Sequence, residues 1–200
     1  GKLAWSKKLP SAILGELATA DINRNGVDEI VFNTVSHLHV LDQKGNYLAG
    51  FPKKLNGIAS SPVSVLDYDN NKKYRFLIGC ASGRIININT SGKEVAGWKH
   101  VNRGVKISNK ITHFVINGKD YIQAIDSTGF QNLLGRDGVE RNFDSVKISS
   151  PYLFKKGKNA VSSRFYQLST NGIKTTNLLG QTDMLPVSLS NMRFVKNYES

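Results

Sequence analysis

Side-chain oxygens recur at alternate positions in one short segment of the chain, from Asp21 to Glu29. Oxygen-bearing side chains stand at its first, third, fifth and ninth positions, and Gly26 stands at the sixth, where a sharp turn is needed. Calcium takes roughly six to eight oxygen ligands in flexible geometry, so alternate side chains of a tight loop can converge on one ion. Two interpretations stay open: a calcium loop, or a polar hairpin whose Asn and Asp side chains cap their own backbone.

A second loop, from Asp67 to Arg75, repeats the first one 46 residues later in altered form. It keeps Asp67, Asp69 and Asn71 at the first, third and fifth positions. It carries Lys72 at the sixth position and Arg75 at the ninth, and a cation in place of a carboxylate opposes calcium. We therefore predict that Lys72 or Arg75 pairs with Asp67 and Asp69, so that an ion pair stands in for the metal.

The elements that carry these loops are marked by a periodic aromatic residue. The four members are separated by 46, 47 and 45 residues: Trp5, Phe51, Trp98 and Phe143. A glycine-containing turn precedes each of the last three at nearly the same offset. Short strands repeated at this period are typical of β-propeller blades. The strict period favours packing between blades over a row of sugar-stacking platforms.

The sequence predicts an all-β fold, a β-propeller of about four four-stranded blades within a single domain, residues 1–200. The blades are expected at roughly 11–51, 57–98, 104–143 and 144–178, with partial blades at 2–9 and 182–200. No segment shows a sustained helical period. Closed rings have roughly four to eight blades. Either the terminal pieces share a blade and close the ring, or the chain is part of a larger propeller, and we favour the second reading.

The first loop resembles the calcium loops of FG-GAP and VCBS-type propeller repeats, in which the loop joins the first two strands of a blade. Phe32 stands where an EF-hand needs a bidentate glutamate, which excludes that motif. The resemblance implies a structural Ca²⁺ and an outward-facing Asp28. The ligands that it implies are Asp21, Asn23, Asn25, the carbonyl of Val27, and Glu29.

The ends of the predicted blades extend this resemblance. Gly50-Phe51-Pro52 and Gly97-Trp98 are similar to blade ends in VCBS and quinoprotein-like (PQQ-type) propellers. The family implies an exported bacterial protein in the periplasm, at the cell surface or secreted. No residue of this chain matches the cofactor site of the quinoprotein enzymes, so we predict no cofactor-binding residue besides the calcium ligands.

The net charge of +12, from 27 basic and 15 acidic residues, invites a polyanionic partner such as a nucleic acid, an anionic glycan or a membrane surface. The basic residues fall in two classes of loop, which project from opposite faces of a propeller. This spread weakens the case for one docking patch, and no nucleic-acid-binding motif is visible. We expect no nucleic-acid partner, and no apolar run reaches the roughly 20 residues of a transmembrane helix.

The remaining chemistry-bearing residues form no recognisable catalytic set. Cys80, the single cysteine, lies in an apolar run and is expected in the core. We therefore predict no catalytic residue and a non-catalytic binding or scaffold module. Its expected partner is a protein or a glycan, and it is also expected to contact the remainder of its own longer chain. Two alternatives stay open: a fragment of a propeller enzyme, quinoprotein-like or glycan-acting, and a polyanion-binding module.

Overall fold

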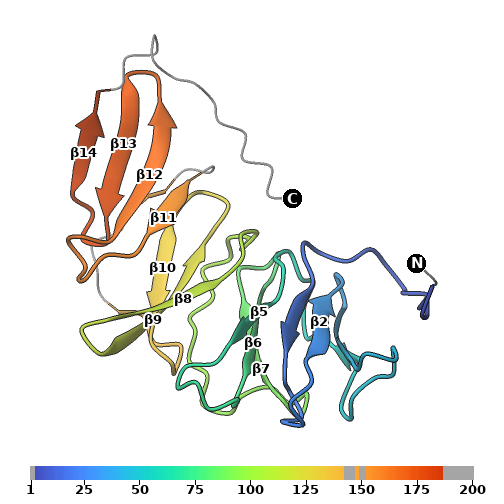
Figure 1. Ribbon diagram of the computed structural model, residues 1–200. Coiled ribbons are helices and arrows are strands. Elements are labelled where there is room, and N and C mark those ends of the chain that lie inside the picture. Colours follow the sequence, from blue (N-terminus) through green and yellow to red (C-terminus); the bar gives the residue numbers. More distant parts are fainter. Residues whose placement is uncertain (1–2, 142–146, 149–151, 187–200) are drawn as a thin grey trace. The chain divides into compact units, whose positions relative to one another are not determined.

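The computed structural model describes residues 3–141, 147–148 and 152–186, in which fourteen β-strands and no helix occur. The strands form four antiparallel sheets, and each sheet follows the chain in simple up-and-down order (Figure 1). The chain divides into two compact units, Gly1–Asn142 with the first three sheets and Phe143–Ser200 with the fourth. The predicted all-β architecture of successive blades is therefore confirmed.

Two sheets have four strands and two have three. The first blade consists of β1 (Ala18–Ala20), β2 (Glu29–Asn33), β3 (His37–Leu41) and β4 (Lys53–Lys54). The second consists of β5 (Ser64–Leu66), β6 (Arg75–Gly79) and β7 (Ile85–Asn89), and the third of β8 (Thr112–Ile116), β9 (Lys119–Ile125) and β10 (Gln131–Leu134). The fourth consists of β11 (Leu153–Lys155), β12 (Arg164–Ser169), β13 (Gly172–Asn177) and β14 (Thr182–Leu185).

The fourth strand of the second and third blades is shorter than predicted. In each it is reduced to one isolated bridge outside the sheet, Ile88 with Glu94 and Leu134 with Glu140. The chain turns away soon after the bridge of the second blade, because Gly97 has a φ of 76° that does not continue a strand. Four-stranded pairing in these two blades is therefore incomplete.

The ends of the chain also differ from the prediction. Residues 3–9 form no strand, so the fourth strand expected over 2–9 is not found in its described part. Residues 182–185, expected to open a further partial blade, form β14 and pair with β13 of the fourth sheet. The rest of that predicted piece, 187–200, lies outside the described residues, as do Phe143 and residues 149–151.

Two of the periodic aromatic residues, Phe51 and Trp98, pack against the next blade, as predicted. Phe51 meets Phe76 of β6 edge-on, with ring centroids 5.9 Å apart. Trp98 packs so closely under the third blade that a Cβ at Gly138 would lie 2.9 Å from its indole ring. Only a glycine fits there, since the φ of Gly138 is also 81°.

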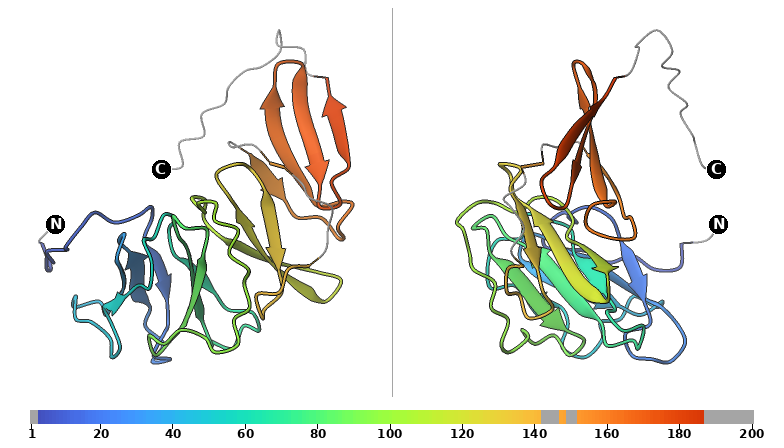
Figure 2. Two further views of the ribbon diagram at one scale, coloured as in Figure 1. Left: turned by 180° about the vertical axis from the view of Figure 1, so that it is seen from behind. Right: turned by 90° about the vertical axis from the view of Figure 1, so that its left-hand side faces the viewer.

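Side chains of the middle blade alternate between two cores. Phe76 and Ile78 pack with the first blade, and Leu77 packs with the third. This period of two places the three sheets of the first unit side by side in chain order (Figure 2). Cys80 is fully buried in the first of these cores, as predicted. The stacking brings equivalent loops of neighbouring blades to the same end of the unit.

Candidate functional site

The first loop begins with the buried carboxylate of Asp21, directly after β1, and ends with that of Glu29, the first residue of β2. Asp21 and Glu29 are 4% and 2% exposed, whereas Asn23, Asn25 and Val27 are exposed. The turn between them is sharp because Arg24 and Gly26 have φ angles of 62° and 85°. The structure thus brings the two predicted carboxylates inward and leaves the intervening residues at the surface.

Glu29, at the end of the loop, accepts hydrogen bonds from residues at the start of the loop. Its Oε2 accepts the backbone N–H groups of Ile22 and Asn23 at 2.7 and 3.3 Å. Its Oε1 accepts Nδ2 of Asn23 at 2.8 Å. Both carboxylate oxygens are therefore engaged by N–H donors, which stabilises the turn from within.

The remaining polar side chains cap the loop backbone. The N–H of Asn25 donates to Oδ1 of Asn23 at 3.0 Å, and the N–H of Val27 donates to Oδ1 of Asn25 at 2.8 Å. The N–H of Gly26 donates to Oδ2 of Asp21 at 3.1 Å. This is the capping that the polar-hairpin interpretation predicts.

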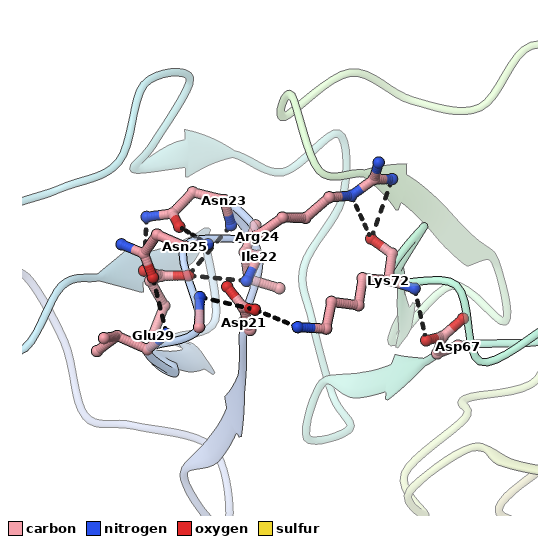
Figure 3. Close-up of polar contacts among 10 residues, drawn as sticks. Asp21, Ile22, Asn23, Arg24, Asn25, Glu29, Asp67 and Lys72 are labelled. Atoms are coloured by element: carbon pink, nitrogen blue, oxygen red, sulfur yellow. Dashed lines mark hydrogen bonds and ion pairs between the residues drawn. The ribbon is translucent and has the colours of Figure 1, made fainter.

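A cation from the second blade reaches into this loop (Figure 3). Nζ of Lys72 lies 2.5 Å from Oδ2 of Asp21, whose side chain is 6% exposed. The hydrogen bond from Lys72 holds the pKa of Asp21 below its usual value, and the same bond raises the pKa of Lys72. In return, Nε and a terminal nitrogen of Arg24 each donate to the carbonyl of Lys72 at 3.4 Å. The two loops therefore hold each other.

The predicted pairing within the second loop is wrong in its partners. Lys72 pairs with Asp21 of the first loop, and Asp69 pairs with Arg136 of the third blade at 2.7 Å. The guanidinium of Arg75 donates to the backbone carbonyls of Lys73 and Tyr74. The cations and carboxylates pair between blades because stacking places loops of neighbouring blades side by side.

The second loop nonetheless keeps the backbone of the first. Asn70 and Lys72, which stand 46 residues after Arg24 and Gly26, have φ angles of 51° and 60°. Oδ2 of Asp67 accepts the N–H of Lys72 at 2.8 Å, as Asp21 accepts that of Gly26. The same conformation is thus built with a lysine where the first loop has a glycine.

The arrangement of the predicted ligands can be compared with what calcium needs. The side-chain oxygens of Asn23, Asn25 and Glu29 accept N–H groups, and Asp21 meets an ammonium. Among these predicted ligands, only Oδ1 of Asp21 is a buried side-chain oxygen without a partner in the part of the chain that the structure describes. An oxygen that accepts one N–H keeps a second lone pair, but the ammonium of Lys72 occupies the carboxylate of Asp21 that a divalent ion would need. Calcium binding stays a prediction, which an experiment below decides.

Asp28, expected to face outward, is exposed and lines an open cavity of about 350 Å³. The cavity runs beside the inner strands β1 and β5, and Asp67, Tyr74 and Lys110 also line it. The ammonium of Lys110 lies 3.4 Å from a carboxylate oxygen of Glu16. These groups form a mixed polar surface on which no nucleophile and base are brought together.

A second cluster that sequence reasoning missed joins the second and third blades. Arg136 contacts Asp120 through Nε at 2.6 Å and stands over the ring of Tyr68 at 4.9 Å. Nε2 of His113 lies 2.7 Å from Oδ1 of Asp120. Burial alone would raise the pKa of Asp120, but the hydrogen bonds from Arg136 and His113 outweigh it and lower that pKa. The sequence carries no signal for these pairs, because the repeat offset relates loops of different blades and does not say which side chains meet.

The fold and these loops define a β-propeller-type protein in which cations of the second and third blades pair with carboxylates of the preceding blade. Two solved structures share the fold, both of BBS1N in complex with ARL6DN, from crystals soaked with lead and with mercury. Their TM-scores are 0.58 and 0.61, with 13% and 11% sequence identity. The matches cover 88% and 90% of this chain, and 68% and 58% of the matched chains.

The sequence comparisons add no family to this likeness. No protein-family model matches the chain, and no curated protein sequence matches it. Within the described residues, no helix is long and apolar enough to cross a membrane. The likeness to the two solved structures therefore shows the fold alone.

Proposed function

We propose that this chain is a non-catalytic β-propeller module that binds a protein partner on one end of its first three blades. The observation that carries the proposal is a surface of four segments that contain no acidic residue and expose apolar side chains, here called the loop face. It comprises residues 34–36, 54–58, 81–84 and 101–106. The two matched structures support a partner of this kind, since each contains BBS1N in complex with ARL6DN.

Hydrogen bonds join the segments of the loop face into one surface. The N–H of Ala59 donates to the carbonyl of Val35, and the N–H of Ala81 donates to the carbonyl of Ile58. A terminal nitrogen of Arg84 donates to the carbonyl of Asn56 at 2.9 Å. Oδ1 of Asn102 approaches the next segment so closely that a Cβ at Gly83 would lie 2.8 Å from it. The turn between β6 and β7 is thus at the centre.

Apolar side chains on this surface are exposed. Ile58 and Val101, which flank the central turn, are 69% and 71% exposed, and Val35 is 41% exposed. Single exposed apolar residues are common, but several around one turn are typical of a binding surface. These side chains offer a partner the apolar centre that interfaces contain.

The charges of the loop face specify the partner further. Its segments contain four basic residues and no acidic one, the basic residues being Lys54, Arg84, Arg103 and Lys106. Arg84 and Arg103 are paired with Glu94 and Glu140, at 2.6 and 2.7 Å. Lys54 and Lys106 are exposed. This arrangement favours a partner whose apolar contact residues are surrounded by carboxylates.

The proposal is tested with two matched peptide libraries. One combines acidic and apolar residues, and in the other lysine replaces each acidic residue. We expect the chain to retain only acidic peptides, and the variant Ile58→Ser/Val101→Ser to bind them at least about tenfold more weakly. Equal retention of both libraries, or unchanged binding by the variant, would contradict the proposal.

Heparin distinguishes this proposal from polyanion binding. A polyanion site depends on charge alone, so heparin would bind the Ile58→Ser/Val101→Ser variant as tightly as the unaltered chain and would release with rising salt. Peptide binding that needs Ile58 and Val101 supports the protein-binding module instead. Export to the periplasm or cell surface stays a prediction of the family resemblance.

A further inference from the structure

Lys72 stands at a backbone position that disfavours a lysine. Its φ of 60° lies in the left-handed region, where the first loop has Gly26. A side chain in this region costs free energy that glycine does not pay, and such residues persist where the surroundings compensate. The second loop therefore needs a specific reason to carry a lysine there.

The contact with Asp21 supplies that reason. The carboxylate of Asp21 is nearly buried, and Nζ of Lys72 lies 2.5 Å from its Oδ2. A buried carboxylate without a positive partner is costly. Half of the Lys72 side chain, 49%, is exposed, so the ammonium keeps water on its other side. The backbone N–H of Gly26 also donates to Oδ2 of Asp21, at 3.1 Å, but Lys72 brings the positive charge.

We propose that the ammonium of Lys72 is the resident cation of the Asp21–Glu29 loop and locks the first blade to the second without a metal. The lock is reciprocal, because Arg24 of the first loop donates to the carbonyl of Lys72 in the second. Each loop thus gives a cation to the other. The second blade positions the lysine through the same turn conformation that positions Gly26 in the first.

The neighbouring pair of blades repeats the arrangement with different residues. Asp69 of the second loop meets the guanidinium of Arg136, which comes from the third blade. In both cases the blade that follows in the chain supplies the cation to the loop of the blade before it. Arg136 and Lys72 come from different turns of their blades, and the side chain of Asp69 is 53% exposed against 6% for Asp21. The second pair therefore shares the direction of the contact between blades, but not the burial of the carboxylate.

Thermal unfolding of three variants tests the proposal. Lys72→Met removes the charge and keeps the stem, Lys72→Gly removes the side chain and suits the left-handed backbone, and Lys72→Arg keeps a cation. In EDTA, we expect Lys72→Met to melt below the unaltered chain, Lys72→Arg to melt closer to it, and Lys72→Gly to melt above Lys72→Met. An unchanged Tm for Lys72→Met would overturn the proposal.

Calcium gives the second arm of the experiment. We expect millimolar Ca²⁺ to leave the Tm of the unaltered chain where EDTA leaves it, because Lys72 holds the Asp21 carboxylate. If Ca²⁺ raises the Tm of Lys72→Met alone, the proposal is supported further, since the Asp21 carboxylate is then free to bind the ion. A rise of equal size in the unaltered chain would overturn the proposal and establish the calcium loop instead.

A double-variant cycle connects the effect to Asp21 itself. We expect Asp21→Asn/Lys72→Met to be less destabilised than the sum of the two single variants, because each single change already breaks the pair. Additive effects would contradict a direct lock. The lock lies at the opposite end of the blades from the loop face, so its failure leaves the peptide experiment unaffected.

Discussion

The two ends of the three-blade unit use their charges in opposite ways. One, here called the clamp end, comprises residues 21–29, 67–75, 117–120 and 135–138, and it holds seven of the chain's 15 acidic residues. Its cations Lys72 and Arg136 lie on carboxylates of the preceding blade. The loop face at the other end has four basic residues and no acidic one.

This difference indicates a division of labour. Charges at the clamp end pair between blades, so they are used to hold the blades in place. At the loop face, the exposed cations and the apolar side chains of Ile58 and Val101 remain available to a partner. The basic residues are spread over both ends, as predicted, and the uneven distribution of the acidic residues distinguishes the ends. Substitutions at the clamp end should therefore change stability, and those at the loop face should change binding.

Acid is expected to have the largest effect on stability. Burial lowers the pKa of His39 to about 4, and that of His100 to about 4. The unfolded chain protonates these histidines first, so their contribution to stability is present above a pH of about 6.5 and is lost as the pH falls toward 4. For His39, this lowers the free energy of unfolding by up to about 3 kcal/mol. Melting curves between these pH values check it.

His39→Leu provides the control for this pH dependence. His39 is 1% exposed, and its ring stacks on Phe32 with centroids 4.8 Å apart. A leucine there should remove the share of the acid loss that comes from His39. An undiminished loss would contradict the assignment.

At still lower pH, protonation of Asp21 at the clamp end should reduce stability further. The pKa of Asp21 is lowered by Lys72, so this stabilisation is present above the unfolded value and disappears as the pH falls through the folded value. Lys72→Met should lack this second loss, which would be seen as a flatter melting profile in the acid range.

Arg136→Ala is expected to have the next largest effect. It removes contacts to Asp69, Asp120 and Tyr68, and it leaves Asp120, whose side chain is 13% exposed, with one fewer donor. We expect a loss of about 2 kcal/mol in the free energy of unfolding by urea. Peptide binding by the loop face should not change.

The matched control for this arginine lies at the other end. Arg84 also pairs with a carboxylate, Glu94, but that side chain is 38% exposed. Arg84→Ala should therefore change the free energy of unfolding by less than about 1 kcal/mol. Equal losses for the two arginines would remove the distinction between the ends.

The third effect concerns binding. Ile58→Ser/Val101→Ser should weaken peptide binding about tenfold, equivalent to about 1.4 kcal/mol. Both side chains are exposed, so the urea midpoint should stay close to that of the unaltered chain. Val115→Ser, at a 39% exposed position on β8, is a control for loss of exposed apolar surface. A lowered midpoint with unchanged binding would assign Ile58 and Val101 to packing.

Much of the fold could be predicted because the repeat is local. Gly45, Gly92 and Gly138 mark the same turn in three blades, and the 46-residue offset joins Asp21 to Asp67. Blade number and loop equivalence follow from such spacings. The reduced fourth strands could not be predicted, because a single bridge and a full strand leave the same alternating pattern over a few residues.

The sequence pointed to the two loops, but it did not show which of their charged residues pair. The offset identified Lys72 as a cation at the glycine position, but sequence spacing alone suggested an acid in the same loop. Lys72 and Asp21 are 51 residues apart, and only the stacking of sheets decides that they meet. Pairing between blades depends on which side chains are long enough to reach the neighbouring blade, and the repeat period does not contain this information.

The smallest effect should come from the exposed lysines, and it gives the most direct comparison of the two ends. Lys54→Ser/Lys106→Ser removes two cations from the loop face, and we expect peptide binding to fall a few-fold at low salt and less at high salt. Lys73→Ser/Lys119→Ser removes two exposed cations from the clamp end and changes the net charge equally. It should leave binding unchanged. If both double variants weaken binding alike, the attraction comes from the net charge of +12 rather than from the loop face. A loss confined to Lys54 and Lys106 would place the acidic partner on that face.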